Sequence, residues 1–93
     1  MCDFLVRVYK RKYFNLYSDD SGEFIIHNTK KDFKDGHTHI RNYNTAKFLI
    51  DLALHKTVPK KKLNRYLYQS LIRITDDDSY CKKINIEKSK VRR

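Results

Sequence analysis

The hydrophobic pattern of this chain changes its period once, near residue 44, and that change limits the folds open to it. Before this point apolar and polar residues alternate, which is typical of strands that bury one face. After it apolar residues recur every three or four positions, which is typical of amphipathic helices. Strands that precede the helices, rather than alternating with them, predict an α+β domain.

The alternating part predicts an N-terminal antiparallel β-hairpin or three-stranded meander. Five apolar residues occupy even positions, namely Phe4, Val6, Val8, Phe14 and Leu16. The basic run 10–12 interrupts them, so this part is one bent strand or two short ones. Residues 19–22 are typical of a turn, and residues 24–27 of the returning strand. The polar segment 30–43 is expected to be irregular.

The second part predicts two or three packed α-helices. The first covers residues 46–54, capped by Asn44 or Thr45, and its broad apolar surface makes it the central helix of the core. Pro59 is well placed to begin a second helix. The three aspartates at 76–78 predict the cap and first turn of a third. Residues 84–86 fit either a helix or a strand, and residues from about 88 to 93 are expected to form a frayed basic tail.

Length and charge narrow the class of protein further. Residues 1–93 suffice for a single small basic domain. The net charge is +10, and from residue 47 onward 13 basic residues face 5 acidic ones. Such a charge favours nucleic acid or an acidic protein as partner. Cys2 and Cys81 have no metal-binding or redox spacing, and no apolar stretch could span a membrane, so we expect a cytoplasmic protein without membrane contacts.

Clusters of basic residues predict contacts with the phosphates of DNA or RNA. Lysines 60–62 fall in the first turn of the predicted second helix, where they oppose its dipole and where a bound anion would relieve the cost. A non-catalytic nucleic-acid-binding module is therefore the favoured function. The predicted contacts are Lys60, Lys61, Lys62, Arg65, Lys10, Arg11, Lys12 and Arg41. Tyrosines 9, 13, 17, 66 and 68 are predicted to stack on unpaired bases.

Two alternatives stay open. A small adaptor or inhibitor, of the kind that phages and mobile elements carry, would use a tyrosine-rich surface or the edge of the first strand. Its partner would be an acidic protein or a second copy of the chain, in a homodimer. A metal-dependent nuclease or phosphoesterase would use His37 and His39, whose imidazoles share one side of an extended chain. The sequence places no third ligand, so it predicts no cofactor and no catalytic residue.

Overall fold

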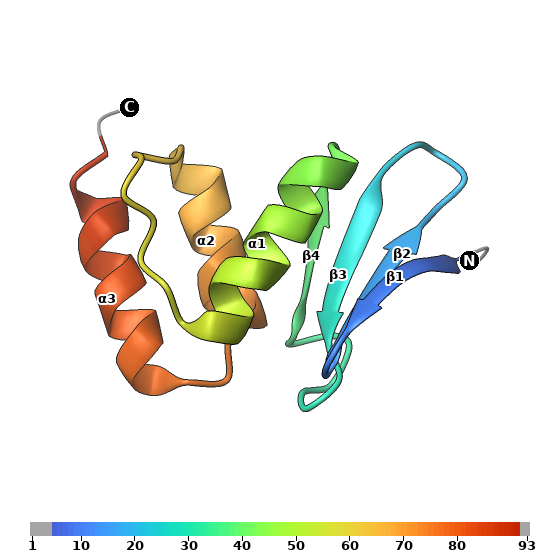
Figure 1. Ribbon diagram of the computed structural model, residues 1–93, viewed down its shortest axis with the longest axis horizontal. Helices are drawn as coiled ribbons and strands as arrows, with labels where there is room; N and C mark the ends of the chain where they lie inside the picture. Colours follow the sequence, from blue (N-terminus) through green and yellow to red (C-terminus); the bar gives the residue numbers. More distant parts are fainter. Residues whose placement is uncertain (1–4, 92–93) are drawn as a thin grey trace.

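The computed structural model describes residues 5–91 and confirms the α+β class. A sheet comes first and three helices follow. The elements are β1 (Val6–Arg11), β2 (Phe14–Ser18), β3 (Phe24–Asn28), β4 (His37–Ile40), α1 (Tyr43–His55), α2 (Arg65–Ile74) and α3 (Asp78–Ser89). All three helices lie on one side of the sheet: α1 and α2 pack against it, and α3 packs against α2 on the side away from the strands (Figure 1).

The sheet has four antiparallel strands in the order β1-β2-β3-β4, one more than the expected meander. The additional strand, β4, lies in the segment for which the sequence predicts irregular structure. Its inward-facing residues are Thr38 and Ile40, both buried. The Thr38 hydroxyl bonds to that of Ser70 on α2 at 2.7 Å, with both groups buried. Because a polar pair occupies a core position here, hydrophobic alternation does not reveal this strand.

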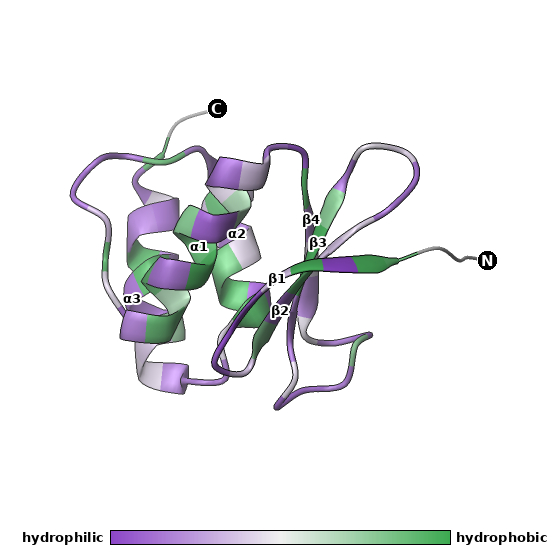
Figure 2. Cartoon of the chain, turned by 45° about the vertical axis from the view of Figure 1, so that its right-hand side comes forward, coloured by the Kyte–Doolittle hydropathy of each residue, from purple (hydrophilic) through white to green (hydrophobic). Residues whose placement is uncertain are grey.

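β1 pairs with β2 through an irregular register, with a β-bulge between Arg7 and Tyr9. Tyr9 therefore lies opposite Leu16 and packs against the core. The even-position pattern predicts Val6 and Val8 on the core face, but they are 61% and 42% exposed. The expected burial is wrong for both residues. At Val8 the extra residue of the bulge interrupts the alternation. Val6 precedes the bulge and lies on the same side of the sheet as Phe24 and Ile40, but it is left exposed. Figure 2 shows the apolar start of β1 in green, well away from the helices.

The core lies between the sheet and the helices. Leu16 and Ile26 contribute from the sheet, and their burial is complete. α1 is the central helix, as the sequence predicts, and it contacts β2, β3, β4 and α2. The buried residues of α1 are Ala46, Leu49, Ile50, Leu52 and Ala53. Removing this apolar surface from water is the main driving force for folding.

Two of the three helix starts differ from expectation. α1 is capped by Asn42 rather than Asn44 or Thr45, since the Asn42 side chain accepts from the Thr45 amide. α2 begins at Arg65, capped by Asn64, rather than at Pro59. Lysines 60–62 consequently lie in a loop and do not oppose the dipole of α2, so the expected helix strain is absent. α3 is capped by Asp77, within the predicted aspartate run.

The helix at the C-terminus extends into the segment from about 88 to 93 that was expected to be a frayed tail. Residues 84–86, which fitted a helix or a strand, are helical, and α3 continues through Ser89. Val91 packs against the core. Residues 92 and 93 of the predicted tail, like Cys2 and Phe4, lie outside the described part of the chain. Within residues 5–91, no helix combines the length and apolar content that crossing a membrane requires.

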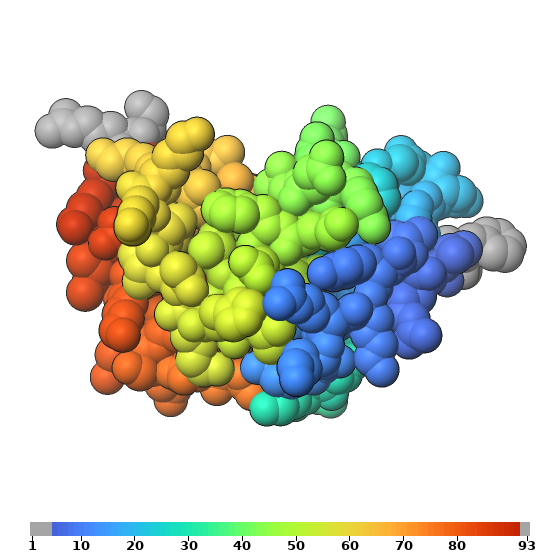
Figure 3. All heavy atoms as spheres, viewed as in Figure 1, coloured from blue at the N-terminus to red at the C-terminus, as the bar shows by residue number. Residues whose placement is uncertain are grey.

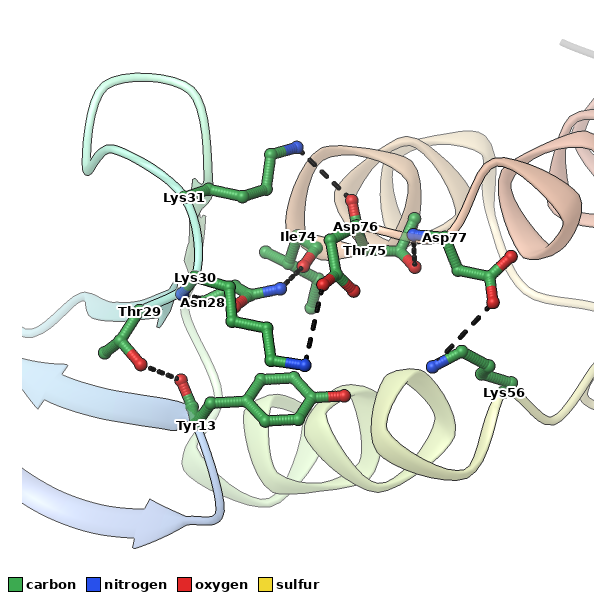
Figure 4. A network of polar contacts seen from close by, with 10 residues as sticks. All are labelled: Tyr13, Asn28, Thr29, Lys30, Lys31, Lys56, Ile74, Thr75, Asp76 and Asp77. Atoms are coloured by element: carbon green, nitrogen blue, oxygen red, sulfur yellow. Dashed lines mark hydrogen bonds and ion pairs between the residues drawn. The ribbon is translucent and has the colours of Figure 1, made fainter.

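Polar contacts join the sheet to the connection between α2 and α3 (Figure 4). Lys30 Nζ lies 3.9 Å from a carboxylate oxygen of Asp76, and Lys56 Nζ lies 3.9 Å from one of Asp77. Lys30 Nζ also lies 4.1 Å from the centre of the Tyr13 ring. Lys31 Nζ donates to the carbonyl oxygen of Thr75 at 3.2 Å. These contacts connect the loop after β3 and the end of α1 to the segment between α2 and α3.

Candidate nucleic-acid interface

The face of the sheet opposite the helices is not covered by any other element of the described chain (Figure 1). Side chains alternate between the two faces of a strand, so register defines this surface. Two rows of directly paired residues cross all four strands. One row is Lys10, Asn15, His27 and His37, and the other is Arg7, Tyr17, Ile25 and His39. We call these eight side chains the outer face.

Aromatic and imidazole rings form a continuous group at the β3–β4 end of the outer face. Phe33, from the loop before β4, stacks on His37 with ring centres 4.4 Å apart and an interplanar angle of 11°. Its ring also lies 5.2 Å from that of His27, and the His37 ring lies 5.2 Å from that of His39. Phe33 is 41% exposed, so a flat apolar ring faces solvent beside the imidazoles.

Backbone carbonyl groups hold two of these imidazoles in place. A ring nitrogen of His37 lies 2.6 Å from the carbonyl oxygen of Phe33, and one of His27 lies 2.9 Å from that of Lys31. Burial lowers the pKa of His37 below its ordinary value, and the positive charges of His39 and Arg73 act in the same direction. His37 is therefore less readily protonated than an ordinary histidine.

The outer face carries positive charge without an acidic partner in its rows. Arg7 and Lys10 lie at the β1 end, and neither row contains a carboxylate. Glu23 lies at the margin, where its carboxylate is 3.3 Å from His39 Nδ1 and 3.8 Å from Arg41 Nε. Rings at one end and cations at the other give a surface on which bases can stack and phosphates can be neutralised.

One polar group on the outer face has no hydrogen-bond partner. Asn15 is 8% exposed, and its Nδ2 donates to the Tyr17 hydroxyl at 3.1 Å. Its Oδ1 is the one buried side-chain polar atom within residues 5–91 that lacks a partner. An unsatisfied buried group of this kind costs about 1–3 kcal/mol, so the centre of this face is not optimised for stability.

The predicted phosphate contacts do not form one surface. The loop that carries lysines 60–62 lies in yellow at the upper left of Figure 3, and β1 lies in blue at the lower right, with α1 between them. The eight residues therefore divide into separate groups. Of the eight, Lys10 alone belongs to the outer face. Arg41 lies at the margin of that face, where its Nε is 3.8 Å from the Glu23 carboxylate.

The other predicted contacts have structural surroundings of their own. Arg11 Nη1 lies 2.9 Å from a carboxylate oxygen of Asp51. Lys12 lies in the turn between β1 and β2 with φ of 56°. Arg65 Nη1 donates to the Lys88 carbonyl at 3.4 Å. Among the described residues, none of the ion pairs involves lysines 60–62.

Sequence reasoning missed the most specific part of this surface. Arg7, His27 and Phe33 are not among the predicted contacts, although Tyr17 is among the stacking tyrosines. The alternation of His27 with the buried Ile26 is visible in the sequence. The pairing of His27 with His37 depends on the register of a strand that the pattern does not reveal.

The sequence also offers the histidines as metal ligands. His37 and His39 do project to the same face of β4, and His27 lies opposite His37 on β3. The structure contains no group of three or more His, Cys, Asp or Glu side chains arranged to hold a metal ion within residues 5–91. Ring nitrogens of His27 and His37 face carbonyl oxygens, and one of His39 faces Glu23.

Comparison with known proteins identifies no family, no curated protein and no solved structure that matches the chain.

Proposed function

We propose that this protein is a non-catalytic nucleic-acid-binding module that binds unpaired bases on the outer face of its sheet. The observation that carries the proposal is the outer face itself, an uncovered four-stranded surface with clustered rings, two cations and no carboxylate in its rows. Known RNA-binding modules stack two or three bases on aromatic side chains of such a sheet. A base stacked on an aromatic ring contributes about 1–3 kcal/mol.

The geometry favours single strands over duplex. Phe33 stacks on the ring of His37 and is still 41% exposed, and a base must leave its own stack to pack against this ring. The net charge of +10 supplies the long-range attraction that any polyanion would experience. The rings thus provide a preference for unpaired bases that charge alone does not provide.

The test is fluorescence anisotropy with labelled 12-nucleotide oligouridylate, oligothymidylate and a 12-base-pair duplex. We expect micromolar affinity for the single strands at 50 mM salt, weaker duplex binding, and a loss of affinity of about tenfold or more at 200 mM salt. Phe33→Ala should weaken single-strand binding about fivefold or more. Absence of binding at 50 mM salt would exclude the proposal.

Phe48→Ala is the matched control. Phe48 is 43% exposed, nearly the same fraction as Phe33, but it lies on α1 in the helical layer. We expect this variant to bind as the wild type does. Equal losses for Phe33→Ala and Phe48→Ala would show that the outer face is not the binding surface.

A second function has separate support, namely the binding of a protein strand at the edge of the sheet. β1 is an edge strand, and Leu5, Val6 and Val8 are exposed there. A pairing of two copies would bring the Arg7 and Lys10 side chains of both onto one pair of strands, so charge favours an acidic partner strand over a homodimer. The bulge and these cations also restrict indiscriminate pairing.

Calorimetry with a peptide that alternates valine and glutamate tests this second function. Val6→Lys combined with Val8→Lys should abolish binding, because lysine at an exposed edge opposes strand addition. Both positions are exposed, so the melting temperature serves as a check that the variant folds. Sedimentation could instead show that the wild type is a dimer and that the same variant is a monomer. The partner of the β1 edge would then be a second copy of the chain and not an acidic protein.

A further inference from the structure

A groove of about 530 Å³ lies where β4 ends and where α1 and α2 begin. Both helices start at the same end of the molecule (Figure 1). Polar residues around the groove include Glu23, His39, Arg41, Asn42, Asn64 and Tyr66. A second hollow of about 430 Å³ adjoins it and shares Glu23 and Arg41.

The groove is continuous with the outer face. His39 belongs to the second row of that face and also lines the groove. Its side chain is 45% exposed, so it is accessible at the boundary between the two surfaces. A strand of nucleic acid that leaves the rings of Phe33 and His37 past His39 would therefore enter the groove.

Tyr66 gives the groove a fixed aromatic surface. The residue is 55% exposed although it lies in the first turn of α2. Its hydroxyl donates to the carbonyl oxygen of His39, which ties the ring to β4. An exposed ring that is already held in place loses little conformational freedom when a base stacks on it.

The groove also offers donors suited to a phosphate. The Arg41 side chain is 90% exposed, and its nearest carboxylate, that of Glu23, lies at the long distance of 3.8 Å. The side-chain oxygens of Asn42 and Asn64 accept from backbone amides as helix caps. Their NH₂ groups are therefore the parts left to donate to a ligand. Among the described residues, Glu23 is the one carboxylate that lines the groove.

From this arrangement we infer that the groove is a second nucleotide subsite, in which a base stacks on Tyr66 and the neighbouring phosphate contacts Arg41. The inference rests on the proposed function, because it places this nucleotide next to those bound on the outer face. The subsite also predicts that Glu23, unlike Tyr66 and Arg41, opposes binding. Removing the Glu23 charge should release Arg41 and His39 toward the phosphate and should strengthen binding.

Anisotropy with 12-nucleotide oligouridylate at 150 mM salt tests the subsite. We expect Tyr66→Leu and Arg41→Gln each to weaken binding about threefold or more, and Glu23→Gln to strengthen it about twofold or more. Tyr66→Phe should weaken binding less than Tyr66→Leu does, because it keeps the ring and loses only the hydrogen bond that holds the ring in place. Arg65→Gln is the charge-matched control, since Arg65 neighbours Tyr66 in α2 but does not line the groove.

Wild-type affinity in both Tyr66→Leu and Arg41→Gln would overturn the subsite and leave the outer face as the whole interface. An equal loss in Arg65→Gln and Arg41→Gln would also overturn it, because net charge alone would then explain the effect. Failure of the proposed function is distinct, since the wild-type protein itself would then show no binding. Circular dichroism melts confirm that each variant is folded.

Discussion

The side-chain amide of Asn28 donates to the carbonyl oxygen of Ile74 at 2.8 Å and so joins the end of β3 to the last turn of α2. The last carbonyl groups of a helix have no partner within it, and this hydrogen bond satisfies one of them. Lys31 Nζ donates to the carbonyl oxygens of Arg73 and Thr75, both at 3.2 Å. The sheet therefore caps the C-terminus of α2, with a cation where the helix dipole favours one.

Two asparagines of the sheet should differ sharply in their effect on stability. Asn28 is fully buried with both ends of its amide bonded, to the Ile74 carbonyl and the Lys30 amide, whereas Asn15 has an unpartnered Oδ1. We expect Asn28→Leu to lower the free energy of unfolding by about 2 kcal/mol or more, and Asn15→Leu to leave it unchanged or to raise it, because that change removes an unsatisfied buried group. Urea denaturation measures both, and similar losses would contradict this account.

Stability should fall in mild acid because of His37. Burial comes first among the causes that lower its pKa in the folded state, so the unfolded chain takes up a proton at higher pH than the folded one. Stability is then lost as the pH falls below about 6.5, the value for an unfolded histidine. The charged or titratable groups near it are His27, His39, Lys34 and Arg73.

Melting temperatures at pH 7.5 and 5.5 check this pH dependence. We expect the wild type to lose stability between the two values and His37→Gln to lose clearly less, whatever its absolute stability. The pKa values of Asp19 and Asp77 are lowered by hydrogen bonds, so these carboxylates titrate below the window. The same decline in both proteins would assign it to another group.

The two groups of cations should contribute differently to nucleic-acid binding. We expect Arg7→Gln with Lys10→Gln to weaken binding of oligouridylate and to reduce the salt slope by about 0.7 for each phosphate that is no longer neutralised. Lysines 60–62, all changed to Gln, should have little effect at 150 mM salt, where charges are screened within about 8 Å. If the loop variant lost more affinity than the Arg7 and Lys10 variant, the loop and not the outer face would be the binding surface.

Lys12 should be a position where glycine stabilises the fold. Its φ of 56° lies in the left-handed region, where a side chain costs about 1–2 kcal/mol. We expect Lys12→Gly to raise the melting temperature, because glycine adopts this conformation without that cost. Lys10→Gly in β1 is the control and should lower it, since glycine weakens a strand. A lower melting temperature for Lys12→Gly would show that the lysine side chain itself stabilises the turn.

The fold class was predictable because the two hydrophobic periods in this chain lie in separate halves. The apolar face of α1 and the aspartate cap of α3 follow local rules, and both can be located from the sequence. The start of α2 cannot, because Pro59 is a strong local signal and the capping bond of Asn64 to Leu67 is a weaker one in the sequence.

The outer face was harder to predict for a physical reason. Its rows depend on the pairing of His27 with His37, which involves the partly polar strand β4, and on the bulge that sets the pairing of β1 with β2. Clusters of lysine in the sequence indicate charge but not its position. The exposed lysines of the 57–64 loop lie with the helices, while a less basic surface carries the rings.

The two edges of the sheet differ in one respect that governs how copies of this molecule could assemble. On β4, the carbonyl oxygens of His37 and His39 already accept from Arg73 and Tyr66 of α2. β1 has no such cover from the described residues. Because only the β1 edge can accept another strand, each molecule can add one strand and no more. Molecules joined in this way would form a closed pair and could not grow into a fibril.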